Sequence, residues 1–172
     1  MRQRRVQLAA VVAIVSIVSV VATAAVAGNG QDVKAKLDGF QEVPSISTDG
    51  NGKFKAKILS NEIQYRLKYR DLEGGAVAAA HIHFAQRHVN GGIVAFLCGG
   101  GGKPACPPAP ATVTGTIVPT DVLAVPAQGF AAGEFDELVR AIRAGATYAN
   151  VHTATFGGGE IRGQINGGKN DD

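Results

Sequence analysis

Hydrophobic and polar positions alternate with a period of two along much of the chain. Three segments show the alternation most clearly, at 33–40, 52–59 and 62–69. A period of two is typical of β-strands that turn one face to a core and the other to water. Turn-forming residues interrupt the alternation at 49–52 and at 60–61, so the second and third segments are predicted to form a hairpin.

Five further segments have the composition of strands and are separated by glycine-rich turns: 76–84, 92–97, 111–118, 147–153 and 160–165. No regular alternation of strand and helix patterns accompanies them. The sequence therefore predicts an all-β fold, an antiparallel Greek-key sandwich or barrel of about eight strands with one short helix.

The predicted helix lies at 135–143, where the apolar period changes. Phe135, Leu138, Val139 and Ile142 recur at helical spacing, acids come early, arginines come late, and Gly145 follows the end. This charge order suits the helix dipole, and glycine is common just beyond a helix. We expect an amphipathic helix that covers one end or the seam of the barrel.

The first 27 residues have the parts of an export signal. Arg2, Arg4 and Arg5 precede an apolar run over 6–26, which ends in the small-residue sequence Ala-Val-Ala. This pattern is typical of a cleaved signal peptide, and the alternative is a retained membrane anchor. Either one places the remainder outside the cytosol.

These limits predict a short linker at 28–32, one domain over 33–166 and a flexible tail at 167–172. The whole chain has 17 Lys and Arg against 14 Asp and Glu. Without the three leader arginines the counts are equal, so the basic charge belongs to targeting. The lysines and arginines of 53–57 and 66–70 alternate as solvated strand faces do, and nucleic-acid binding is not expected.

Cys98 and Cys106 are the only cysteines, and the residues between them are rich in glycine and proline. In an oxidising compartment such a pair is expected to form a local disulfide. A metal site is the alternative, although no histidine lies between the two cysteines.

His81, His83 and His152 are the candidate metal ligands. Because side chains alternate along a strand, His81 and His83 leave the same face, with Ile82 on the other. His152 lies in another predicted strand and completes a three-imidazole site if the two strands face each other. A site of nitrogen ligands without thiolates favours copper or zinc over calcium or magnesium. The alternative is that these histidines are ordinary surface or hydrogen-bonded strand residues.

The chain resembles the CHRD domain, a module first recognised in chordin and common in exported bacterial proteins. The resemblance rests on LDGFQEVP at 37–44, YRLKYRDL at 65–72, AAHIH at 79–83, AIRAG at 141–145 and YANVHTATFGGGEIRGQI at 148–165. It implies an immunoglobulin-like β-barrel that is distantly similar to copper/zinc superoxide dismutase. It implies no biochemical role.

The dismutase similarity implies roles for four residues. His81 and His83 match the copper-ligand pair, His152 matches a late ligand, and Arg162 falls where an arginine guides the anion. The bridging histidine and the zinc ligands have no clear counterparts, although a loop could bring His88 near. A mononuclear copper site is therefore the form that the resemblance allows. A simpler expectation for Arg162 is an ion pair with Glu160 on the same strand face.

Three functions follow from the sequence. The favoured one is a binding or envelope-associated structural module, whose partner is an unknown protein or envelope component. A mononuclear copper-binding protein is the alternative, and a dismutase-like redox enzyme is the third. The only membrane contact expected is through the leader, if it is retained. The positions of His81, His83 and His152 separate these functions.

Overall fold

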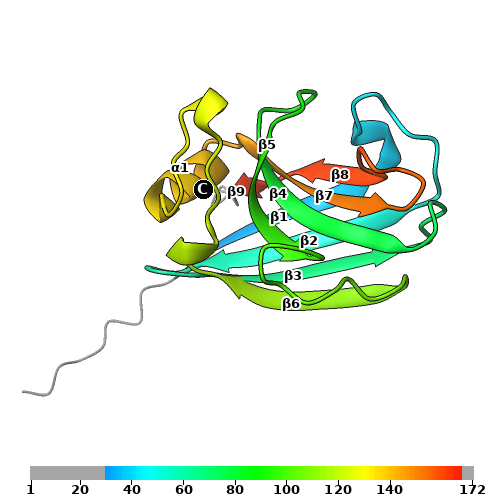
Figure 1. The fold of residues 1–172 in the computed structure, drawn as a ribbon, viewed down its shortest axis with the longest axis horizontal. Helices are drawn as coiled ribbons and strands as arrows, with labels where there is room; N and C mark the ends of the chain where they lie inside the picture. Colours follow the sequence, from blue (N-terminus) through cyan, green and yellow to red (C-terminus); the bar gives the residue numbers. More distant parts are fainter. Residues whose placement is uncertain (1–29, 168–172) are drawn as a thin grey trace, which may run out of the picture.

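The alternating segments form antiparallel strands in the computed structural model, which describes residues 30–167 (Figure 1). The strands are β1 (Gln31–Asp38), β2 (Asn51–Ile58), β3 (Ile63–Arg70), β4 (Val77–Phe84), β5 (Gly92–Cys98), β6 (Ala111–Ile117), β7 (Thr147–Thr153), β8 (Ile161–Gln164) and β9 (Asn166–Gly167). The first strand ends earlier than predicted because the Asp38 carboxylate accepts a hydrogen bond from the Gln41 amide and caps a 3-10 turn, η1 (Gly39–Gln41). Phe40 lies in that turn and is 75% exposed.

The strands follow the order β5-β4-β7-β8-β1-β2-β3-β6, and β9 adds to β1. All pairs are antiparallel, and three neighbouring pairs, β3–β6, β4–β7 and β1–β8, are not consecutive in the chain. The free edges of β5 and β6 lie in contact. Nearby, the hydroxyl of Tyr65 on β3 donates to the carbonyl of Leu97 on β5 at 2.7 Å. The predicted all-β antiparallel fold is confirmed, as a nearly closed barrel.

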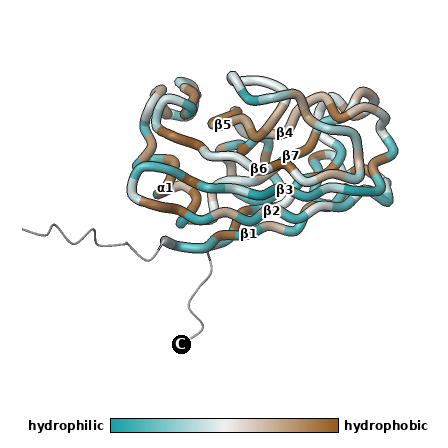
Figure 2. Tube along the Cα trace, turned by 90° about the horizontal axis from the view of Figure 1, so that it is seen from below, coloured by the Kyte–Doolittle hydropathy of each residue, from teal (hydrophilic) through white to brown (hydrophobic). Residues whose placement is uncertain are grey.

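The barrel encloses one hydrophobic core. Its largest fully buried side chains include Phe54 of β2, Leu67 of β3, Ile82 of β4 and Ile161 of β8. Burying a side chain of this size contributes roughly 1.5–3 kcal/mol. The polar positions of β1, β2 and β3 point outward, as the period of two predicts, and Figure 2 shows hydrophilic positions recurring along these strands.

The predicted helix forms as α1 (Phe135–Arg143) and lies at one end of the barrel, near β9 (Figure 1). Leu138 and Ile142 on its apolar face are 0% and 1% exposed. Gly145 ends the helix with φ of 68°, a left-handed conformation that glycine adopts without strain. Two 3-10 turns, η2 (Pro119–Asp121) and η3 (Pro126–Gln128), precede it.

The predicted disulfide is present. Cys98 at the end of β5 bonds to Cys106 and closes a glycine-rich loop. The loop packs over Phe96, since a side chain added at Gly100 would meet that ring. A disulfide is consistent with a protein that folds outside the cytosol.

The predicted export leader at 1–27 lies outside the described residues, as do residues 168–172 of the predicted tail. Gly167, where that tail was expected to begin, pairs with β1 together with Asn166 as β9. No helix within residues 30–167 has the length and hydrophobicity that a membrane-spanning segment needs.

Candidate metal centre

The three histidines lie together on the outer face of the barrel wall, on β4 and β7. Ile82 and Val151 point into the core and are 0% exposed, so His81, His83 and His152 take the opposite face. In the ladder between the two strands, Ala79 pairs with His152 and His81 pairs with Asn150. This register puts His152 diagonally across from His81. The predicted sharing of one face by His81 and His83 is confirmed.

The ring nitrogens of the three histidines converge. One nitrogen from each ring can be chosen so that all three lie within 4.8 Å of one another. Nδ1 of His81 and Nε2 of His83 are 3.4 Å apart, longer than a usual hydrogen bond. Two imidazole nitrogens that each lie about 2.0 Å from one ion at a tetrahedral angle are about 3.3 Å apart. The spacing of this pair therefore fits a shared ion.

Backbone carbonyls orient two of the rings. Nδ1 of His83 donates to the Gly91 carbonyl at 2.9 Å, and Nδ1 of His152 donates to the Gly157 carbonyl at 3.0 Å. These bonds require the proton on Nδ1, so Nε2 of each ring keeps its lone pair. Metal-ligating histidines are held in this way, with the second ring nitrogen donating to a carbonyl or carboxylate. Gly157 belongs to a tight turn, which is closed by the hydrogen bond from the Gly159 amide to the Phe156 carbonyl.

Nε2 of His152 is buried and has no hydrogen-bond partner among the described residues. Leaving a buried polar atom unpaired costs about 1–3 kcal/mol. A metal ion bound to this lone pair would remove that cost. The donor set, three imidazoles without thiolate or carboxylate, suits copper or zinc. The residues present therefore fit a mononuclear metal site.

Burial keeps the three rings neutral. His81, His83 and His152 are 6%, 8% and 9% exposed. Loss of water around the charged form lowers the pKa of His81 to about 3, with repulsion from His152 and His83 adding to the effect. Burial also lowers the pKa of His83 to about 4 and lowers the pKa of His152. Neutral imidazole is the form that binds a metal.

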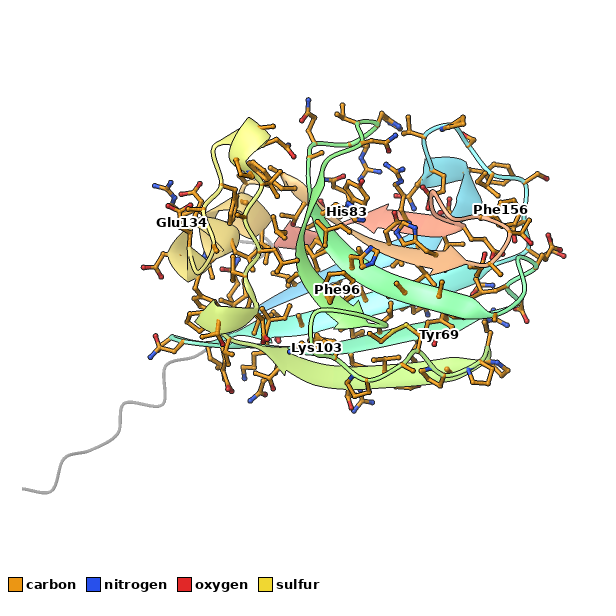
Figure 3. All side chains as sticks on the ribbon, viewed as in Figure 1. Tyr69, His83, Phe96, Lys103, Glu134 and Phe156 are labelled. Carbon is orange, nitrogen blue, oxygen red and sulfur yellow. A yellow bond between two sulfur atoms is a disulfide. The ribbon has the colours of Figure 1, made fainter. Side chains whose placement is uncertain are left out.

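Aromatic rings fix two of the imidazoles. Phe96 of β5 meets His81 edge to face, with ring centroids 4.6 Å apart, and Tyr148 of β7 stacks on His83 at 4.7 Å. Figure 3 labels His83 and Phe96 on their neighbouring strands. Packing of this kind limits the ring rotamers, so the nitrogens keep their positions whether or not an ion is bound.

Arg162 lies beside the histidines, but the predicted ion pair with Glu160 is wrong. Nε of Arg162 donates to Glu42 at 2.6 Å, and Nη2 donates to Asn90 at 2.7 Å. The guanidinium also lies over the Tyr148 ring, 4.5 Å from its centroid. β8 begins at Ile161, so Glu160 lies before the strand and its carboxylate points elsewhere. An anion-guiding role for Arg162 stays a prediction.

Glu160 is a fully buried structural carboxylate. It accepts hydrogen bonds from the Thr48 and Thr153 hydroxyls and from the backbone amides of Glu73 and Gly74, at 2.7–3.0 Å. Burial alone would raise the pKa of this group, but the four donors outweigh burial and hold its pKa below the usual value. Glu160 thereby ties three loops together near the histidine strand β7.

Three residues of the site were not predicted from the sequence: Glu42, Tyr148 and Asn150. Tyr148 and Asn150 precede His152 at a period of two, so the alternation already placed them on the histidine face. No local sequence pattern indicates a role for Glu42, because its partners Arg162 and Asn150 are more than 100 residues away in the chain. Burial raises the pKa of Glu42, against the lowering effect of Arg162 and Asn150. His88 is exposed and lies outside the cluster.

The chain matches the family model described as the CHRD domain over residues 33–165. No curated protein and no solved structure matches the chain. The similarity to superoxide dismutase therefore remains a prediction.

Proposed function

The chain belongs to the CHRD domain family, and from that premise we propose that it is an exported domain that binds one copper ion through His81, His83 and His152. Family membership names no reaction, so the proposal rests on the site. The observation that carries it is the convergence of three neutral imidazoles within 4.8 Å, one of them with an unpaired buried nitrogen.

Because the three imidazoles converge, we favour copper binding over the metal-free binding or structural module that the sequence favoured. A structural or binding module without a metal needs no particular arrangement of these side chains. Three buried imidazoles that turn nitrogens toward one another are costly without an ion, because Nε2 of His152 forms no hydrogen bond. Copper binding is the reading that explains the arrangement.

Copper is favoured over zinc for two reasons. Divalent copper binds a given nitrogen site more tightly than zinc does. Export through the leader would place the site outside the cytosol. There the site would meet extracellular copper, and no cytosolic copper carrier would compete with it for the ion. When bound, the ion supplies Lewis acidity or a single-electron redox couple. The protein's own part is to hold three rings in place and to exclude water from them.

Holding copper, rather than turning over a substrate, is the role that burial supports. No ligand is more than 9% exposed. The side chain of Arg162 is 5% exposed and paired with Glu42, so its charge is already balanced where an anion would approach. We therefore propose that Arg162 positions a loop, through its hydrogen bonds to Val89 and Asn90. The next residue of that loop, Gly91, accepts the hydrogen bond from His83.

The test is copper and zinc binding by a chain that begins at Gly28, which contains the whole core. We expect one copper per chain, held more tightly than zinc. His83→Ala should weaken binding more than the 10- to 100-fold typical of an outer-shell change. His88→Asn is the matched control, because His88 is exposed with φ of 64° and asparagine tolerates that conformation. It should bind copper as the unaltered chain does.

Two results would change the assignment. Equal copper binding by His83→Ala and His88→Asn would show that the three histidines do not form the copper site, and would favour a binding module that needs no metal at this position. Rapid superoxide consumption by the copper-loaded chain, lost in His83→Ala, would move it to the dismutase class. We expect copper binding without such turnover.

A further inference from the structure

A second surface of the barrel has an unusual charge. Eight cationic side chains point outward from β1, β2 and β3, and one of them, Arg70 at the end of β3, pairs with Asp71. We call the other seven the lysine face: Lys34, Lys36, Lys53, Lys55, Lys57, Arg66 and Lys68. All seven are exposed. As separate segments they look like ordinary solvated strand faces, but the fold brings them onto one sheet. Figure 2 shows the three strands side by side.

The strand register places like charges directly opposite one another. Lys34 pairs with Lys55, and Lys55 pairs with Arg66, so these three form one row across the sheet. Lys36, Lys53 and Lys68 form a second row in the same way. Neighbouring strands are about 4.8 Å apart, and like charges directly opposite destabilise a sheet. When no anion is bound, the two rows of like charge therefore lower the stability of the folded protein.

One acid in the described part of the chain lies directly opposite one of these charges, since Asp32 pairs with Lys57 in the strand register. None of the seven forms an ion pair in residues 30–167. Asp32 is the one exposed acid among the outward positions of the three strands, and Asp38 is half-buried and bonded to Gln41. The chain after the leader has equal numbers of acidic and basic residues. The lysine face is therefore a local excess of positive charge on a chain that is neutral as a whole.

Hydroxyl groups continue the surface on the next strand. Thr112, Thr114 and Thr116 of β6 pair with Lys68, Arg66 and Gln64 of β3. A shallow hollow of about 820 Å³ lies here, and its lining includes Lys34, Lys55, Arg66, Thr114 and Thr116. Cations beside hydroxyl donors are the groups that bind phosphate oxygens. The hollow has room for a phosphate headgroup.

We propose that the lysine face binds the surface of a membrane that contains anionic phospholipids. The face is a broad sheet surface, and its outward side chains are cationic, hydroxyl or amide apart from Asp32 at the start of β1. Nucleic acid is the weaker fit, because the outward positions of these strands carry no aromatic ring on which a base could stack. Anionic lipid is the occupant that matches both the charge and the shape.

The position of the leader supports this occupant. The apolar run ends at residue 26 and β1 begins at Gln31. Four residues span at most about 14 Å, so a retained leader would hold β1, and with it Lys34 and Lys36, close to the bilayer. If the leader is cut, the lysine face still supplies a reversible attachment. The proposal does not depend on copper, because the histidines lie on other strands.

The test is binding of the chain that begins at Gly28 to phosphatidylcholine vesicles with and without about 30% phosphatidylglycerol. We expect sedimentation with the anionic vesicles only, and release in high salt, because added ions screen these charges. Each Lys or Arg near an anionic surface strengthens binding about fivefold. The variant Lys34→Gln/Lys55→Gln/Arg66→Gln should therefore bind about 100-fold more weakly.

A charge-matched control lies off the lysine face. Arg140→Gln removes one exposed cation from α1, and it should bind within about twofold of the unaltered chain, whereas the single variant Lys55→Gln should bind about fivefold more weakly. Equal binding of Lys55→Gln and Arg140→Gln would overturn the proposal, as would equal binding to both kinds of vesicle. Binding to duplex DNA without binding to anionic vesicles would also overturn it. Copper binding should be unchanged in both variants, so a failure here leaves the metal proposal intact.

Discussion

At the residue scale, the candidate metal centre depends on side chains that do not touch the ion. Glu42 and Arg162 form a buried pair, with side chains 2% and 5% exposed, and Asn150 donates to the other Glu42 oxygen. Through Val89 and Asn90 this pair holds the loop that positions His83. A network of buried charges is stable only when every member has its partner.

We predict that Glu42→Gln lowers the free energy of unfolding by about 3–5 kcal/mol, because it leaves the Arg162 charge buried without a counter-charge. The double variant Glu42→Leu/Arg162→Met should recover most of that loss. Urea unfolding measures both. The control is Glu137→Gln, which breaks the exposed pair with Arg140 and should cost less than about 1 kcal/mol. A similar loss in Glu42→Gln and Glu137→Gln would show that the buried pair has no special role.

The second prediction at this scale is a pH dependence that comes from Glu160. Its four donors lower its pKa in the folded protein. The group therefore stabilises the fold above its unfolded pKa, near 4.5, and this contribution is lost as the pH falls through the folded pKa. Glu160→Gln should cost about 2–4 kcal/mol at neutral pH, with the gap to the unaltered chain narrowing in acid. A gap that stays constant from pH 7 to pH 3 would contradict this.

The sequence predicted the faces of residues better than their partners. His81 and His83 share a face because of the strand period alone, and the same period put Tyr148 and Asn150 beside His152. Arg162 was expected to pair with Glu160, two residues away, yet it pairs with Glu42, 120 positions distant. Which loop folds over a strand face depends on the path of the whole chain, and no local pattern records that path.

At the element scale, the glycine-rich loop after β5 is the segment most dependent on a covalent bond. The Cys98–Cys106 disulfide closes it, and the loop covers Phe96, whose ring packs against His81. The strands themselves agree with the predicted ranges to within one or two residues at most ends, since alternation and turn residues define them. Strand ends shift where a side chain caps a turn, as Asp38 does.

Replacing both cysteines by alanine should lower the free energy of unfolding by about 2–3 kcal/mol, the chain-entropy value for so short a loop. Thermal or urea unfolding of the oxidised chain and the double variant measures the difference. Adding a reductant should lower the stability of the unaltered chain to the same level and leave the variant unaffected. An unfolding free energy that is insensitive to both changes would mean that the loop is held by packing alone.

At the scale of the whole molecule, the barrel separates two surfaces with different chemistry. The outer face of β4, β7 and β8 lies under loops and holds the histidines and their supporting network, and the outer face of β1, β2 and β3 is open and cationic. One sheet thus provides both surfaces, because β4 and β7, which carry the histidines, lie in one half of the strand order and β1, β2 and β3, which carry the cations, lie in the other. In this account, the lysine face attaches the domain to a membrane while the histidines hold copper.

The most direct test of the central claim is X-ray absorption at the copper edge on the loaded chain. The account predicts one copper with three imidazole nitrogens at about 2.0 Å, and fewer imidazoles in His81→Ala. A first shell of oxygen atoms, or a spectrum that is the same in His81→Ala, would contradict it.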